Sequence, residues 1–176
     1  MKRVISVDLS VQGIKSLQDE LAYRQKWLSA KADALAERLA RLGVHKAEIY
    51  FDAALYDGIN DAKVTVKKSG DCNYTVRANG DSVLFIELGT GIHYPNAPLE
   101  EYIGADRMEH GSYGTGQGQN DYWFYTGQPG NAGGELAKYH KNTTITHGNP
   151  PNMPMYTAVK ELEQEFERIV REVFAE

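Results

Sequence analysis

Five histidines and a set of carboxylates are the residues of this chain whose chemistry could include metal binding or proton transfer. Glu87, His93 and His147 form the set that a metal-assisted hydrolase could use, because imidazole nitrogens and carboxylate oxygens are common zinc ligands. The histidine spacings match neither an HExxH helix, nor a Cys/His finger, nor a calcium-binding loop. A metal-assisted hydrolase therefore stays an alternative, and we predict no metal site, no cofactor and no catalytic residue.

Nucleophilic catalysis finds no stronger local signal. Cys72 is the single cysteine, so an internal disulfide and a Cys-based zinc site are both excluded, and a reducing cytosol is expected. No predicted helix N-terminus stands behind Cys72 to favour its thiolate. There is no Gly-x-Ser-x-Gly elbow, and the glycines of 114–118 lack the GxGxxG spacing of a phosphate-binding loop. The sequence favours a protein that is not an enzyme.

Length and charge narrow the class further. A chain of 176 residues is predicted to be one domain, 1–176, with enough core to fold without disulfides. The net charge of −5, with both signs interspersed, argues against an electrostatic footprint for nucleic acid, because phosphate binding needs clustered Lys and Arg. DNA binding is therefore not expected as a main role, and no sequence-specific nucleic-acid partner is predicted, although a ring that conducts DNA can be acidic inside. No run of eighteen apolar residues is present, so a membrane partner is not expected either.

The elements that would position these residues begin with a long helix over about 11–42. Leucine or isoleucine recurs every seven residues there, at Ile14, Leu21, Leu28, Leu35 and Leu42, and Gly43 is a plausible residue to end the helix. Such a helix would reach on the order of 45 Å, which exceeds the core of so small a domain. We expect part of it to project from the domain or to pack on a neighbouring molecule.

Alternation with period two follows the helix. It predicts strands at 47–52, 64–67 and 74–78, and the apolar run 83–86 fits a strand that is covered on both faces. Asn79-Gly80 is the strongest hairpin signal among the turns between them. An antiparallel β-meander is the simplest arrangement of these strands.

The last third of the chain combines a long loop with a final helix. A glycine-rich segment at about 105–121 is predicted to be flexible, and 122–125 and 142–146 are predicted to be short strands of a hairpin. Apolar residues spaced by three and four from Met155 onward indicate an amphipathic helix, with Pro154 in its first turn. The predicted class is α+β: a long N-terminal helix, an antiparallel β-meander, and a C-terminal amphipathic helix packed on the sheet.

Two short motifs carry a family resemblance. The first reads Glu87-Leu88-Gly89-Thr90-Gly91 at the end of the apolar run, and the second reads Gly148-Asn149-Pro150-Pro151-Asn152-Met153-Pro154-Met155 before the last helix. Their order and spacing resemble those of the minor tail, or tail-completion, family in the head-to-tail connector of tailed bacteriophages and prophages. Two departures are the methionines in place of a common aromatic residue and the long loop 92–122.

The resemblance implies a structural protein of the virion. Its subunits would form a homo-oligomeric ring, for which the resemblance implies sixfold symmetry. The ring would contact neighbouring neck and tail-tube proteins. It would be made in the host cytoplasm and then reside in the neck or tail. The residues expected at the interfaces belong to the two motifs and the aromatic strand: Glu87, Leu88, Gly89, Thr90, Gly91, His93, Tyr94, Trp123, Pro151, Met153 and Met155. A small host binding module, unrelated to virions, is a further alternative.

Overall fold

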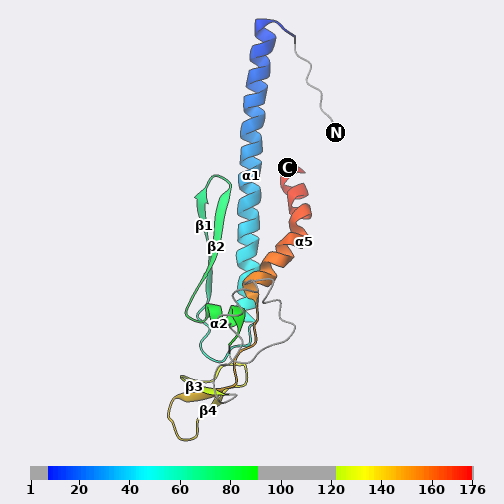
Figure 1. Ribbon diagram of the computed structural model, residues 1–176. Coiled ribbons are helices and arrows are strands. Elements are labelled where there is room, and N and C mark those ends of the chain that lie inside the picture. Colours follow the sequence, from blue (N-terminus) through cyan, green and yellow to red (C-terminus); the bar gives the residue numbers. More distant parts are fainter. Residues whose placement is uncertain (1–7, 91–121, 176) are drawn as a thin grey trace, which may run out of the picture.

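The computed structural model describes residues 8–90 and 122–175 of the chain. The elements follow in the order α1 (Val11–Asp52), β1 (Lys63–Gly70), β2 (Asn73–Asn79), α2 (Val83–Leu88), β3 (Trp123–Thr126), β4 (Glu135–Leu136), β5 (Thr143–Thr146) and α5 (Pro154–Ala175). Helix α1 runs through most of the length of the molecule, with the β1–β2 hairpin on one side and α5 on the other (Figure 1). The α+β class, the long N-terminal helix and the C-terminal helix are therefore confirmed.

Helix α1 is longer than the sequence predicted. The Ser10 hydroxyl caps its start by accepting a hydrogen bond from the Gly13 N–H at 3.1 Å. The predicted end at Gly43 and the predicted strand 47–52 are both wrong, because the helix continues to Asp52. Ala47 and Phe51 lie four residues apart and are both buried, so their spacing fits one helix face as well as it fits a strand.

Gly43 serves packing and not termination. A Cβ atom at this position would lie 3.1 Å from the Cδ1 atom of Leu162 on α5. That separation is tighter than ordinary van der Waals contact, so the missing side chain lets the two helices approach closely. Helix α5 starts at Pro154, as expected, and packs against α1, whereas the prediction placed it on the sheet.

The apolar run 83–86 is not a strand but the start of the short helix α2. The Asp61 carboxylate accepts hydrogen bonds from the N–H groups of Asp81 and Ser82, at 2.9 and 3.0 Å, and from the Ser82 hydroxyl at 2.5 Å. These bonds hold the turn that leads into α2, including its N-cap residue Ser82. The helix buries Ile86 and Leu88 and exposes Leu84 on its other side.

The strands form two small antiparallel sheets, where the prediction had one meander. β1 pairs with β2, and β5 lies between β3 and β4. The β1–β2 hairpin turns at Cys72, which adopts a φ of 54°. The hairpin expected at Asn79-Gly80 is not formed; Gly80, with a φ of 147°, instead leads from β2 toward α2. The pairing of 122–125 with 142–146 is confirmed as β3 and β5.

The core lies where the C-terminal half of α1 meets the β1–β2 hairpin, α2 and α5. Its buried apolar residues are Ala47, Phe51, Ala54, Val64, Ile86 and Ala158. Beside this core, the Lys46 ammonium bridges the carboxylates of Glu161 and Glu165 on α5, at 2.6 and 2.9 Å. The hydrogen bond from Lys46 lowers the pKa of both glutamates. Within the described residues, no helix combines the length and apolar character that crossing a membrane requires.

Candidate functional site

The two motifs singled out in the sequence meet beyond the C-terminal end of α1. Glu87, at the end of α2, is only 3% exposed. Its two carboxylate oxygens accept hydrogen bonds from the backbone N–H groups of Met155 and Tyr156, at 2.9 and 3.0 Å. These are donors of the first turn of α5, and a carboxylate there also complements the positive end of the helix dipole. Glu87 therefore caps the C-terminal helix.

The next residues of the two motifs pair as a β-bridge. Thr90 and Asn149 exchange two backbone hydrogen bonds of 2.9 and 3.0 Å, and the Asn149 amide donates to the Thr90 hydroxyl at 3.0 Å. Gly89 makes this approach possible, because its φ is 74° and an added Cβ would lie 2.7 Å from the Asn149 carbonyl oxygen and the Pro151 nitrogen. The first motif thus binds the second within a single chain.

Three asparagines hold the segment 54–57 that follows α1, and we call Asn131, Asn149 and Asn152 the asparagine clamp. Asn152 accepts from the Leu55 N–H at 2.8 Å and donates to the Leu55 carbonyl at 2.9 Å. Asn131 accepts from the N–H of the next residue, Tyr56, at 2.7 Å, and Asn149 accepts from the Asp57 N–H at 2.6 Å. Consecutive backbone donors are therefore each satisfied by a different asparagine, which fixes the end of α1 on the motif region.

Asp57 extends the clamp to the second sheet. Its buried carboxylate accepts from the Thr146 hydroxyl of β5 at 2.8 Å and from the Gly134 N–H at 2.9 Å. A Cβ atom on Gly134 would lie 2.7 Å from the carboxylate, so a glycine is needed there. Because these bonds satisfy the buried carboxylate, the arrangement suits a rigid junction.

The structure places the predicted interface residues in different environments. Glu87, Leu88, Gly89 and Met153 are buried within the chain, and Thr90, Pro151 and Met155 are partly buried. Trp123 is paired with Thr146 in the register of β3 and β5. The remaining predicted positions, Gly91, His93 and Tyr94, lie outside the described residues, as does the loop at about 105–121. A role of these residues between subunits stays a prediction.

The residues of the metal-assisted alternative do not gather in the described part of the chain. No group of three or more His, Cys, Asp or Glu side chains that could hold a metal ion occurs in residues 8–90 and 122–175. The Glu87 carboxylate is directed at the start of α5. The His147 ring lies edge-on to Tyr122, with 6.4 Å between the ring centroids, and His93 is outside the described residues.

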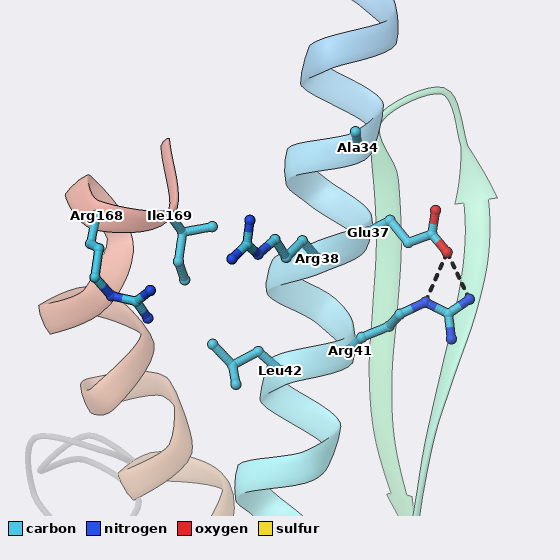
Figure 2. A pocket seen from close by; sticks show the side chains of 7 residues that line it. All are labelled: Ala34, Glu37, Arg38, Arg41, Leu42, Arg168 and Ile169. Atoms are coloured by element: carbon cyan, nitrogen blue, oxygen red, sulfur yellow. Dashed lines mark hydrogen bonds and ion pairs between the residues drawn. The ribbon is translucent and has the colours of Figure 1, made fainter. Parts of the chain in front are cut away.

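A cavity of about 580 Å³ lies between α1 and α5 (Figure 2). Arg38, Arg41 and Arg168 line it, which would suggest an anion site if their charges were uncompensated. However, Arg41 pairs with Glu37 at 2.7 Å, Arg168 pairs with Glu172 at 2.6 Å, and Arg38 also pairs with Glu172. The cavity is therefore lined by compensated charges, and the Arg38–Glu172 pair links the two helices.

Sequence reasoning missed Asp57 and the asparagine clamp. Asn149 and Asn152 were part of the second motif, but nothing local indicated that their partners lie more than ninety residues earlier in the chain. Their position beside consecutive prolines, where the chain cannot form regular secondary structure, was the one available signal.

Comparisons of the chain with protein-family models, with curated proteins and with solved structures gave no match.

Proposed function

We propose that this chain is a non-enzymatic structural protein of a tailed bacteriophage or prophage particle, which assembles with copies of itself into a ring at the junction of head and tail. The motif resemblance suggests the family. The observation that carries the ring is an uncovered apolar face on the N-terminal half of α1.

This outer apolar face consists of Ile14, Leu21 and Leu28, which are 45, 52 and 54% exposed. Residues seven apart on a helix drift by only about 20°, so the three side chains lie on one side of α1. Residues 11–28 would span about 27 Å, and in Figure 1 this half of the helix stands clear of the hairpin and largely clear of α5. Large exposed apolar side chains that repeat along one side of a helix favour an interaction surface.

A helix of a second copy is the partner that fits this face. Seven-residue spacing is the pattern of helices that pack side by side along their length. Helix α5 already contacts the end of this part of α1 through one aromatic pair: the rings of Trp27 and Phe174 lie edge-to-face with 5.9 Å between their centroids. In a closed ring every subunit has a neighbour on each side, so the same face would be covered in all copies.

The buried polar residues support a geometric role over a catalytic one. The carboxylate oxygens of Glu87 and Asp57 accept hydrogen bonds from N–H or hydroxyl groups of the same chain. Such bonds fix the angle between α1, α5 and the second sheet. Neighbouring neck and tail-tube proteins would then meet a surface of defined shape.

The test is a pair of double variants in α1. Leu21→Asp with Leu28→Asp places charges on the outer apolar face, whereas Gln12→Asp with Ser16→Asp places the same charges elsewhere on the same half of the helix. We expect the first pair to prevent ring formation, seen by light scattering after size-exclusion chromatography, and to leave separated heads and tails by electron microscopy. The control pair should assemble normally.

Three outcomes would refute the proposed function. Particles that are joined and infectious in the complete absence of this chain would exclude a connecting role. Rings that form equally well with both double variants would exclude the outer apolar face. Turnover of a substrate by purified protein carrying stoichiometric metal would favour the metal-assisted hydrolase.

A further inference from the structure

The β1–β2 hairpin has two chemically different faces. One face packs toward α1 with the apolar side chains of Val64, Val66 and Val76. The other face is exposed and polar. The strand register places its residues opposite one another as Lys63 with Asn79, Thr65 with Arg77, and Lys67 with Thr75. We call these six residues the outer hairpin face.

The outer hairpin face is basic in an acidic protein. It carries three cations and no carboxylate, although the chain has a net charge of −5. Lys63, Lys67 and Arg77 form no ion pair with any other residue in 8–90 or 122–175. By contrast, Lys68, which points to the other face, is paired with Asp33 at 2.7 Å. The positive charge of the outer hairpin face is therefore available to an anionic partner.

The spacing of these cations is regular. Residues on one face of a strand repeat about every 7 Å, so Lys63, the pair Thr65–Arg77 and Lys67 occupy three successive steps along the hairpin. Arg77 stands on the neighbouring strand between the two lysines. The row therefore places one positive charge per step, at a distance close to that between neighbouring phosphates along one nucleic-acid strand.

The remaining residues of the face suit the same ligand. The Thr65 hydroxyl donates to the Arg77 carbonyl at 3.3 Å and accepts from the Asn79 amide at 3.5 Å, so it braces the face. Thr75 and the second amide hydrogen of Asn79 add polar groups between the cations, and such groups commonly bind phosphate oxygens. The face has no aromatic side chain on which an unpaired base could stack. The lack of an aromatic platform favours the backbone of a duplex over a single strand, and contacts from cations to phosphates need no particular base sequence.

We propose that the outer hairpin face binds the phosphate backbone of double-stranded DNA without sequence preference. The sequence did not reveal the cluster, because Arg77 is separated from both lysines along the chain and joins them only when the hairpin forms. The even spacing of single charges is what favours DNA over an acidic protein surface. Binding of this kind is separate from ring formation, since it needs only one chain.

The test measures binding of the full chain to a fluorescent 20-bp duplex by anisotropy at rising KCl. Three phosphate contacts predict a slope of about −2.7 in log affinity against log salt, which is about 80-fold weaker binding at 100 mM than at 20 mM. The triple variant Lys63→Gln, Lys67→Gln, Arg77→Gln should lose this binding. The matched control removes three exposed lysines elsewhere, at Lys15, Lys26 and Lys138, and should keep the slope.

The outcomes separate the possible partners. Equal loss of binding in both triple variants would show a general charge effect and overturn the proposal, as would absence of binding by the wild-type chain at 20 mM KCl. Binding to poly-glutamate but not to the duplex would assign the face to an acidic protein and also overturn it. Unchanged melting temperatures of both variants confirm that each measurement reports on folded protein. Because no particles are needed, failure here leaves the ring hypothesis standing.

Discussion

Replacing Glu87 by glutamine provides a direct test of how the two motifs stabilise the chain. The native carboxylate accepts two hydrogen bonds from the first turn of α5, at Met155 and Tyr156. A glutamine has one oxygen, which can accept from one of these two N–H groups, and its own NH₂ group then faces the second N–H. Leaving one buried N–H unsatisfied costs about 1–3 kcal/mol. Losing the charge at the helix N-terminus costs about 1 kcal/mol more.

Together these effects predict a loss of about 2–4 kcal/mol in the free energy of unfolding. For a chain of this size, the melting temperature should fall by about 5–15 °C. Urea unfolding followed by circular dichroism at 222 nm measures the free energy, and calorimetry measures the melting temperature. Glu163→Gln is the matched control, because Glu163 lies on α5 with its side chain 63% exposed. Its effect should stay within about 0.5 kcal/mol.

Equal stability of the Glu87→Gln variant and the wild-type protein would refute this reasoning. It would mean that the carboxylate does not cap α5 in solution, and it would return Glu87 to the group of candidate catalytic residues. A loss of stability confined to Glu87→Gln, without a change in the dependence of unfolding on urea, would support the cap.

Three further predictions follow from the contacts around the motifs. Hydrogen bonds from the Ser82 hydroxyl and backbone N–H, and from the Asp81 N–H, lower the pKa of Asp61 from 3.8 to about 2. The ionised carboxylate therefore stabilises the folded protein fully above about pH 4, and this stabilisation is lost as the pH falls toward 2. The difference in unfolding free energy between the wild-type protein and Asp61→Asn should therefore narrow between pH 5 and pH 2; a constant difference would contradict this. Asn149→Ala removes an acceptor from a buried N–H and should cost about 2–3 kcal/mol in urea unfolding, whereas Asn73→Ala, on the exposed hairpin, should cost less than about 0.5 kcal/mol. Gly89→Ala should destabilise the chain by at least about 2 kcal/mol by calorimetry, because its Cβ would meet backbone atoms at 2.7 Å; a milder effect would show that the β-bridge can shift.

The parts of the fold that the sequence predicted are those with long, regular patterns. The seven-residue spacing from Ile14 to Leu42 defined α1, and the three- and four-residue spacing after Met155 defined α5. Both patterns persist over several turns, so chance matches are rare. β3 and β5 were found because aromatic and β-branched residues favour strands.

The errors fall where short apolar runs fit more than one structure. Alternation at Ala47, Ile49 and Phe51 suggested a strand, but Ala47 and Phe51 also share a helix face, and Ile49 is 51% exposed. Packing against the hairpin and α5 selects the helix. In α2, the turn before the helix is held by Asp61, more than twenty residues earlier, whose carboxylate accepts from the N–H groups of Asp81 and Ser82.

The candidate site was found in part. The two motifs were recognised as the informative segments, but their relation to each other was not, since the bonds between Thr90 and Asn149 join positions 59 residues apart. The cap by Glu87 and the asparagine clamp depend on the same kind of long-range approach. No local pattern encodes such contacts, because the partners lie far apart in the sequence.

The uninterrupted course of α1 has a mechanical consequence. A 42-residue helix is about 63 Å long, and its C-terminal end is held by the bonds to Leu55 and Asp57. Because α5 and the β1–β2 hairpin pack along α1, the three elements would tilt together; a tilt of 10° at the anchored end would move the opposite tip by about 11 Å, if the helix stays straight. A small rotation at the C-terminal end of α1 would thus produce a large displacement of its N-terminal end, as at the long arm of a lever.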